Sequence, residues 1–141
     1  MKEYAPASRV VAGMDGATFG KTSLQDAFAS FTEHWRPRII ANVNGSKVQL
    51  SKFAGEFVWH KHDDSDDFFY VVAGRIEIDF RDGRTIELDA GDLLVIPAGV
   101  EHRPRADSEA HVLNIARAGT VNTGDAENPG AFPAPEQELG R

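Results

Sequence analysis

Two histidines, His60 and His62, are the residues of this sequence with the clearest capacity for chemistry. They end a run with strand character, Gly55-Glu56-Phe57-Val58-Trp59-His60-Lys61-His62. Because alternate side chains of a strand share one face, both imidazoles point the same way and can act as a pair of metal ligands. An isolated His-x-His pair is more often two exposed side chains, so the neighbouring sequence has to decide between these interpretations.

Two further segments add candidate ligands. The acidic segment Asp63-Asp64-Ser65-Asp66-Asp67 follows the pair directly, and residues 91–102 pass through a Pro-x-Gly turn to a third histidine, His102. A carboxylate beside histidines can bind a metal, but for most of these aspartates a solvated turn is the simpler explanation. Alternation does not choose between Asp66 and Asp67, since each shares a face with apolar residues.

The composition narrows the chemistry further. The chain has 141 residues, 41% of them hydrophobic and 26% charged, which is typical of one globular domain. It has no cysteine, which excludes disulfides, thiolate nucleophiles and sulfur-ligated zinc. A net charge of -7 disfavours nucleic-acid and anionic-membrane partners. The sequence also contains no phosphate-binding loop, dinucleotide fingerprint or nucleophile elbow.

The elements that must position these residues are mostly short strands. From Arg38 to Arg117 the hydrophobic pattern has a period of two, and Asn44-Gly45 and Asp82-Gly83 indicate hairpin turns. The expected strands are 39–43, 47–53, 56–62, 68–73, 75–80, 84–88, 92–96, 100–103 and 109–117. A series of short strands separated by turns predicts an all-β antiparallel sandwich or barrel.

The two ends of the chain differ from this central region. Residues 1–37 are expected to form an irregular arm over 1–21 and one short helix over 23–34, because Ser23 and Asp26 have the form of a capping box. Residues 118–141 are expected to be a tail that covers the barrel early and is disordered late. We find no signal peptide and no membrane span, so a cytoplasmic protein is expected.

The two histidine segments resemble the two motifs of the cupin superfamily, and in particular small single-domain cupins. The matching residues are Gly55, His60, His62, Asp67 and Gly74 in the first motif, and Gly91, Pro97, Gly99 and His102 in the second. The resemblance covers residues 38–117. It implies a double-stranded β-helix, or jelly-roll, barrel that holds one divalent metal through His60, His62, Asp67 and His102. The family's acidic ligand is usually Glu, so the shorter Asp67 leaves open whether it binds the metal directly.

Such a site suggests two classes of function. Imidazoles with or without a carboxylate suit Fe, Mn, Ni or Zn, and a metal with open positions can polarise an oxygen of a small organic substrate. The first hypothesis is therefore a metal-dependent enzyme of the oxygenase or isomerase/lyase type. The alternative is a non-catalytic small-molecule binding or sensor protein, and a third possibility is a barrel whose histidines hold only water.

Four further residues are candidates for the cavity around the metal: Gln49, Glu56, Phe69 and His111. An acid or base such as Glu56 or His111 near the metal would favour catalysis, and an apolar lining would favour binding. His111 alternates with Leu113 and Ile115, so it either faces the barrel interior or is an ordinary core residue. His34 is expected at the end of the helix, where a histidine interacts favourably with the helix dipole.

Exposed apolar faces predict self-association. The strand face with Phe68, Tyr70 and Val72 and the helix face with Phe28 and Phe31 are too hydrophobic to remain exposed in a small monomer. We therefore expect a two-fold homodimer, as the family resemblance also implies.

Overall fold

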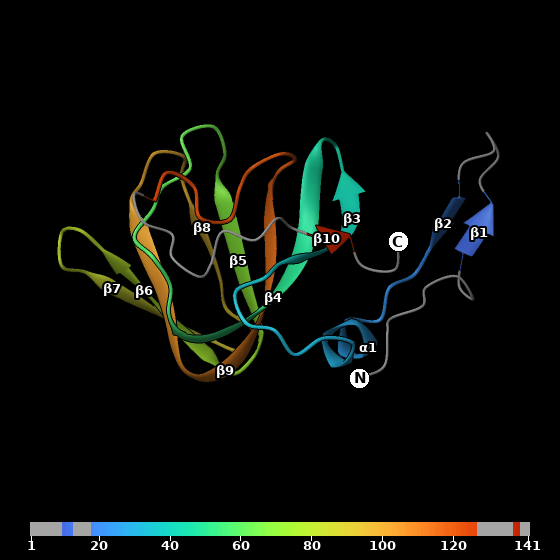
Figure 1. Ribbon diagram of the computed structural model, residues 1–141, viewed down its shortest axis with the longest axis horizontal. Coiled ribbons are helices and arrows are strands. Elements are labelled where there is room, and N and C mark those ends of the chain that lie inside the picture. The colour runs from blue at the N-terminus through green and yellow to red at the C-terminus, as the bar shows by residue number, and fades with distance from the viewer. Residues whose placement is uncertain (1–9, 13–17, 127–136, 139–141) are drawn as a thin grey trace.

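The described part of the chain folds into an all-β jelly-roll barrel with one short helix on its outer surface (Figure 1). The computed structural model describes residues 10–12, 18–126 and 137–138. Its elements are β1 (Val10–Ala12), β2 (Thr18–Gly20), α1 (Leu24–Ala29), β3 (Arg38–Val43), β4 (Ser46–Glu56), β5 (Asp67–Ala73), β6 (Arg75–Phe80), β7 (Thr85–Asp89), β8 (Leu93–Ile96), β9 (His102–Arg117) and β10 (Gln137–Glu138). Among the described residues, no helix is long and apolar enough to cross a membrane.

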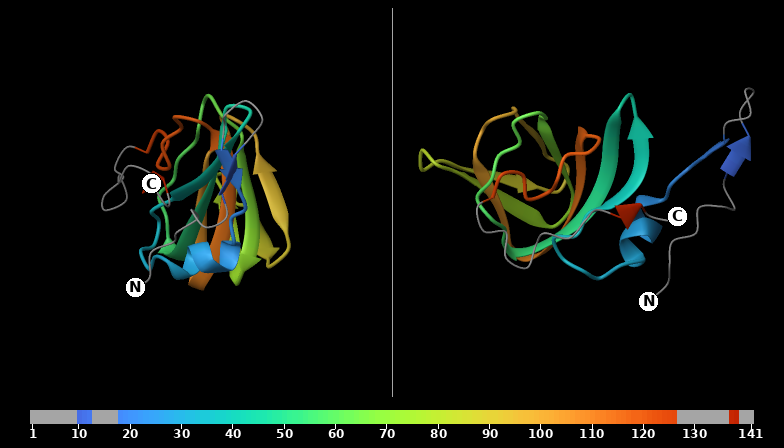
Figure 2. Two further views of the ribbon diagram at one scale, coloured as in Figure 1. Left: turned by 90° about the vertical axis from the view of Figure 1, so that its right-hand side faces the viewer. Right: turned by 45° about the horizontal axis from the view of Figure 1, so that its top comes forward.

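Strand β9 connects the two layers of the barrel. It pairs with β6 over residues 102–105, with β5 over 111–115, and with β4 along both halves. The strand order is β10-β3-β4-β9-β5-β8, and β7 joins through β6. The expected strands 100–103 and 109–117 are therefore parts of one long strand, which curves along the barrel in the right-hand view of Figure 2.

The segment that carries His60 and His62 is not the regular strand that we expected over 56–62. Strand β4 shifts register between Phe53 and Gly55, where Gly55 has a φ of 78°. Such a bulge bends a strand and interrupts its alternation. Beyond Glu56 the chain leaves the sheet, and His60 pairs with His102 through an isolated bridge.

Both predicted hairpins are present. Asn44 and Gly45 have φ angles of 50° and 76°, the left-handed conformations that a tight two-residue turn requires. The turn at Asp82-Gly83 is wider, since β6 ends at Phe80 and β7 begins at Thr85. Within this turn, Gly83 donates its N–H to the carbonyl of Phe80 (3.0 Å).

Helix α1 begins as predicted and ends early. The Ser23 hydroxyl accepts the N–H of Asp26 (3.2 Å), which confirms the N-cap. At the other end the Ser30 hydroxyl donates to the carbonyl of Ala27 (2.6 Å), so the helix ends at Ala29 and the prediction of a helix to residue 34 is wrong. The helix covers the outer face of β4, where Phe28 packs in one cluster with Leu50.

The structure also describes parts of both chain ends. Strands β1 and β2 form an antiparallel pair that lies away from the barrel in Figure 1 and Figure 2. The arm predicted over residues 1–21 is therefore not wholly irregular. Residues 118–126 lie against the loop that carries Lys61. The disorder expected late in the tail concerns residues that lie mostly outside the described part of the chain, although β10 pairs in parallel with β3.

Candidate metal centre

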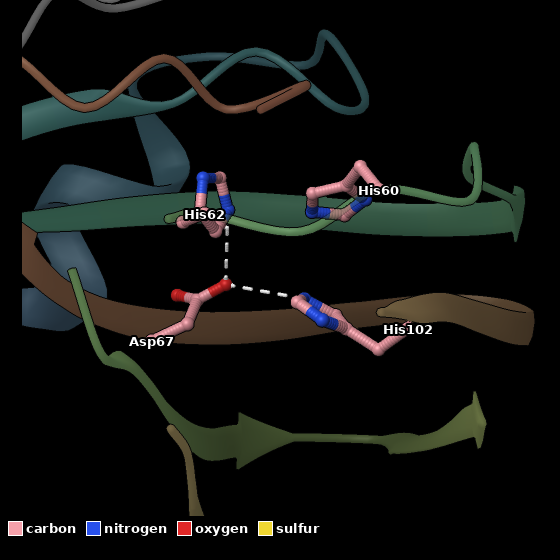
Figure 3. Close-up of side chains that lie close together, drawn as sticks. All are labelled: His60, His62, Asp67 and His102. Atoms are coloured by element: carbon pink, nitrogen blue, oxygen red, sulfur yellow. Dashed lines mark ion pairs between the residues drawn. The ribbon is translucent and has the colours of Figure 1, made fainter. Parts of the chain in front are cut away.

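Four side chains meet inside the barrel: His60, His62, Asp67 and His102 (Figure 3). His60 and His62 come from the loop after β4, Asp67 opens β5 and His102 opens β9. One potential ligand atom from each residue lies within 4.8 Å of those of the others. The four residues are only 2%, 7%, 8% and 1% exposed, respectively. Sequence positions more than 40 residues apart therefore form one compact donor set.

Backbone hydrogen bonds fasten the two histidine segments together. The N–H of His60 donates to the carbonyl of His102 (3.0 Å), and the N–H of His102 donates back to the carbonyl of His60 (2.9 Å). The N–H of Gly99, in the Pro-x-Gly turn, donates to the carbonyl of His62 (2.8 Å). These bonds fix the spacing of the imidazoles before any ligand binds.

Two of the rings are held in the tautomer that metal binding needs. Nδ1 of His60 lies 2.9 Å from the carbonyl of Val58, and Nδ1 of His102 lies 2.9 Å from the carbonyl of Val100. A carbonyl can only accept, so each Nδ1 carries the proton and each Nε2 keeps its lone pair. Nε2 of His102 is buried without a hydrogen-bond partner among the described residues. This donor set fits a divalent transition metal.

Asp67 faces the histidines. Its Oδ2 lies 3.4 Å from Nε2 of His62 and 3.4 Å from Nε2 of His102 (Figure 3). Burial raises the pKa of this carboxyl, but the facing imidazoles of His102 and His62 together outweigh burial and hold the pKa below its ordinary value. Burial and, after it, the electrostatic effect of the neighbouring His102 lower the pKa of His60 to about 4. At neutral pH the site therefore combines an ionised carboxylate with a neutral His60 imidazole, as a metal requires.

The structure gives Asp66 and Asp67 different roles, which the alternation of side chains along a strand could not distinguish. Oδ1 of Asp66 accepts the N–H of Ala98 (3.0 Å) and so belongs to the turn. Asp67 belongs to the buried cluster. Direct coordination by the shorter Asp67 side chain stays a prediction.

A pocket extends from the cluster along the barrel interior. Its volume is about 470 Å³ when the open space at its mouth is included. Gln49 and Phe69 line it, as the sequence predicts. The other residues around it are aromatic, polar or small: Trp35, Pro37, Lys47, Ser51, Phe53, Phe57, Pro104, Asn114, Ala116, Thr120 and Asn122.

The prediction that Glu56 lines this cavity is wrong. Its side chain is 61% exposed and lies 3.6 Å from the guanidinium of Arg103, outside the barrel. We expected Glu56 to share a face with His60 because a regular strand alternates. The bulge at Gly55 breaks that alternation and turns Phe57 inward instead.

The prediction that His111 lines the cavity is also wrong. Its ring stacks on Phe28 of α1 with a centroid separation of 4.5 Å, and its Nε2 lies 3.1 Å from a carboxylate oxygen of Glu109. Alternation shows which residues share a face but not which face is inside. On β9 the interior face carries Val112 and Asn114, while His111 lies under the helix.

His34 lies apart from the cluster, although not for the expected reason. Its Nε2 lies 2.8 Å from the carboxylate of Glu109, and both side chains are more than a third exposed. Because α1 ends at Ala29, His34 cannot interact with the end of that helix.

The sequence did not indicate that residues 118–126 help to build the site. The N–H of Lys61, between the two ligand histidines, donates to a carboxylate oxygen of Asp125 (2.8 Å). The N–H of Asp125 donates back to the carbonyl of Lys61 (3.2 Å), and Thr120 and Asn122 line the pocket. Gly119, Gly124 and Asp125 are residue types typical of turns, but they do not show where such a turn lies.

Comparison with known proteins agrees with this geometry. Residues 46–116 match the family described as Cupin domain (Cupin_2), which is half of the chain. A cupin-2 domain protein from Shewanella frigidimarina NCIMB 400 has a solved structure that is 45% identical, with a TM-score of 0.67, over 68% of this chain and 93% of that one. The chain belongs to the cupin family, and its jelly-roll fold is confirmed.

Two curated proteins are also similar to this chain. The uncharacterized protein YdbB of Bacillus subtilis (strain 168) is 48% identical over 67 residues, which are 48% of this chain and 59% of YdbB. Polyketide synthase CurC of Streptomyces cyaneus is 37% identical over 94 residues, which are 58% of this chain and 60% of CurC. The chain thus spans about three fifths of the length of each of these relatives.

Proposed function

We propose that this cupin is a metal-dependent enzyme that acts on a small organic substrate. The observation that carries the proposal is the buried group of three imidazoles and one carboxylate, which faces an open pocket. Four protein ligands leave coordination positions for substrate on an octahedral metal. The relationship to a protein named polyketide synthase CurC supports an enzymatic role.

Different residues of the chain would bind the metal and the substrate. His60, His62 and His102 would hold the ion, with Asp67 as a fourth ligand or as an acceptor for a bound water. An Fe, Mn, Ni or Zn ion in this place would polarise a carbonyl, enolate or carboxylate oxygen. Trp35, Phe57 and their neighbours form an apolar wall that limits the access of water to the pocket. Reactions of the oxygenase and isomerase/lyase types both suit this arrangement.

A non-catalytic binding or sensor function is the second candidate. Among the described residues, the pocket has no carboxylate or imidazole apart from the cluster itself, since Glu56 and His111 lie outside it. A general acid or base would then have to be Asp67, Lys47 or a metal-bound water. Substrate binding without turnover is consistent with that lining.

One experiment separates the two functions. Protein loaded with Fe(II), Mn(II), Ni(II) or Zn(II) would be offered a panel of small enolisable ketones and phenols in deuterated buffer. An enzyme is expected to consume oxygen or to incorporate deuterium, as followed by an oxygen electrode and by NMR, and His102→Ala should abolish either signal. Metal-loaded protein that binds members of the panel but turns none over would contradict the enzyme and favour the sensor.

A further inference from the structure

Polar side chains of two neighbouring strands face the interior of the barrel. On β4, Gln49 and Ser51 are 6% and 2% exposed and line the same pocket as the metal ligands. On β9, Asn114 pairs with Gln49 and lines the same pocket. Buried polar groups cost free energy unless they are hydrogen-bonded. A polar wall at this depth therefore indicates contact with a polar ligand or with water.

Three oxygen atoms of the pocket have no hydrogen-bond partner among the described residues. They are Oε1 of Gln49, Oγ1 of Thr120 and Oδ1 of Asn122, and each atom is buried. As whole residues, Gln49 and Thr120 are only 6% and 8% exposed. A buried acceptor without a donor destabilises the folded chain, so these positions are suited to a ligand that supplies the missing hydrogen bonds.

Two asparagines fix the polarity of this wall. Nδ2 of Asn114 donates to the carbonyl of Phe68 (3.2 Å), and Nδ2 of Asn122 donates to the carbonyl of Trp35 (3.3 Å). Because the backbone holds each amide nitrogen, the Oδ1 atom of each side chain is turned the other way and can only accept. The wall therefore favours a ligand that donates hydrogen bonds, such as an alcohol.

The interior of the pocket admits only a small ligand. The space open to the centres of water-sized atoms is about 40 Å³, which is room for about three water molecules. Aromatic rings close one side, since Trp35 stacks on Phe53 (4.2 Å between centroids) and on Phe57 (4.7 Å). Bonded atoms lie closer together than water molecules, so a ligand of about five non-hydrogen atoms fits this space.

We propose that the pocket binds a small hydroxy ketone, and that Gln49 and Thr120 recognise its hydroxyl group. The hydroxyl would donate to Oε1 of Gln49 and accept from the hydroxyl of Thr120, while the carbonyl oxygen would face the metal cluster. The proposal deepens the proposed function and rests on it only for the end of the ligand that faces the metal.

The test compares a hydroxy ketone with a ketone of the same size. Hydroxyacetone and butanone differ by a hydroxyl group in place of a methyl group, and saturation-transfer-difference NMR would measure their affinities for zinc-loaded and for chelator-treated protein. In both forms hydroxyacetone is expected to bind about fivefold more tightly, because a hydrogen bond to an otherwise unpartnered buried acceptor contributes about that much.

Three outcomes would overturn the proposal. The first is equal affinity for the two ketones, which would mean that the polar wall holds only water. The second is no binding of hydroxyacetone up to tens of millimolar. The third is a preference that vanishes with the metal, because it would come from chelation of zinc by the two oxygens of hydroxyacetone and not from Gln49.

The size limit has a test of its own. In 2-hydroxyacetophenone a phenyl ring replaces the methyl group of hydroxyacetone, and the hydroxy ketone group is unchanged. Because the ring exceeds the space inside the pocket, this compound should not displace hydroxyacetone from the protein. Displacement at equal concentrations would contradict the size limit.

Variants then assign the preference to named side chains. Gln49→Met, which keeps the length of the side chain but removes its amide, should bring the ratio of the two affinities close to one. Thr120→Val should lower the ratio, and Thr120→Ser should keep it. Gln25→Met is the matched control, because Gln25 is an exposed residue of α1 outside the pocket. A ratio that survives in Gln49→Met, or that falls equally in Gln25→Met, would contradict the assignment.

Stability distinguishes recognition of a ligand from a structural role. Oε1 of Gln49 has no partner among the described residues, so Gln49→Met should leave the urea midpoint of ligand-free protein unchanged or raise it. A midpoint that falls, or a variant that does not fold, would mean that Gln49 supports the fold and would contradict its role in recognition.

The two proposals fail separately. Protein that prefers hydroxyacetone in the chelator-treated form but takes up no metal would refute the metal-dependent enzyme and leave the hydroxy-ketone site standing. Protein that takes up metal but binds hydroxyacetone and butanone equally would leave the metal centre standing and refute the hydroxy-ketone site.

Discussion

At the scale of single residues, the centre depends on which protons its side chains carry. The carbonyls of Val58 and Val100 keep Nε2 of His60 and His102 free, and burial keeps His60 neutral at physiological pH. A preset tautomer reduces the reorganisation that metal binding would otherwise require. The metal centre is thus prepared by backbone contacts as much as by the ligands.

Asp67 and Asp66 give a direct test of the fourth ligand. Asp67→Asn should weaken metal affinity at least about tenfold, because the amide is neutral and a poorer ligand. Asp66→Asn should leave the affinity unchanged, since its amide oxygen can still accept the N–H of Ala98. Competition with a chromogenic chelator measures both values. Equal affinities for the two variants would contradict a role for Asp67 at the metal.

Individual residues also show where sequence reasoning succeeds. His60, His62 and His102 could be placed together because their motifs have a recognisable order and spacing. Glu56 and His111 could not be placed, because the bulge at Gly55 and the inward face of β9 depend on contacts between distant strands. Alternation supplies relative positions along one strand, and packing decides which face is buried.

At the scale of elements, an ion-pair network ties β6 to its neighbours. Asp79 on β6 accepts from Arg103 (2.9 Å) and Arg105 (2.9 Å) of β9 and from Thr85 of β7 (2.8 Å). The hydrogen bond from Arg105 contributes most and, with that from Arg103, lowers the pKa of Asp79 to about 2. The two arginines cover Asp79, which is only 8% exposed.

This network predicts how stability depends on pH. Asp79 has a lower pKa in the folded chain than in the unfolded chain, so its contribution is present above about pH 4 and is lost as the pH falls towards 2. Asp79→Asn should lower the free energy of unfolding at pH 7, because the variant has no carboxylate to pair with Arg103 and Arg105. Solvent screens these partly exposed ion pairs, so the expected loss is only about 1–2 kcal/mol. Urea unfolding at several pH values measures this difference.

The control for this prediction is Asp82→Asn. Asp82 is an exposed hairpin carboxylate that pairs with Arg84, and its amide would still accept the N–H of that residue. Its replacement should change stability little. A difference between wild type and Asp79→Asn that stays constant from pH 7 to pH 2 would contradict the role given to the carboxylate.

Residues 118–126 hold the loop that carries His60 and His62 in place, through the hydrogen bonds between Asp125 and Lys61. At Gly124, with a φ of 52°, an added Cβ would lie 2.3 Å from the carbonyl oxygen of Lys61 and 3.1 Å from Nδ1 of His62. Gly124→Ala should therefore displace either the segment or His62. Sequence alone could suggest a turn here but not this close approach.

Gly119→Ala is the matched control for Gly124→Ala. Gly119 is also left-handed, with a φ of 90°, but no described atom lies within 4 Å of its added Cβ. Both variants should lose about 1 kcal/mol of stability from the backbone conformation alone. Gly124→Ala alone should also weaken metal affinity in a chelator competition assay. Equal metal affinities for the two variants would contradict the claim that residues 118–126 position the loop of the ligand histidines.

At the scale of the whole molecule, an apolar face on β8 is exposed among the described residues. Phe28 and Phe31, which we expected at a dimer interface, are buried against the chain's own β4. Leu93 and Val95 on β8, at the end of the sheet order, are 57% and 46% exposed. In the sheet they pair with Tyr70 and Phe68 of β5, which are half-buried.

We propose that two copies of the chain associate through this face. Light scattering after size exclusion should give twice the chain mass of 15.4 kDa at micromolar concentration. Leu93→Glu with Val95→Glu should yield a monomer, whereas Ile86→Glu, at an exposed apolar residue of β7, should not. A monomeric wild-type protein would refute the dimer.

The jelly-roll fold could be predicted from the whole sequence because strand pattern, turns and motif order agree. Its closure by β9 could not, since residues 102–117 form one strand only when β4, β5 and β6 all pair with it. The same long-range pairing brings the ligand histidines together. The fold class could therefore be predicted at this scale, whereas the lining of the pocket could be predicted only in part, at Gln49 and Phe69.

The metal content of untagged protein tests the central claim most directly. Elemental analysis after loading with Fe(II), Mn(II), Ni(II) or Zn(II) should find about one equivalent per chain for at least one of these ions. The His60→Ala variant should lose it, and His34→Ala, whose imidazole lies outside the cluster, should keep it. Less than about 0.1 equivalent of every ion in wild-type protein, or equal uptake by the two variants, would contradict a metal centre at His60, His62, Asp67 and His102.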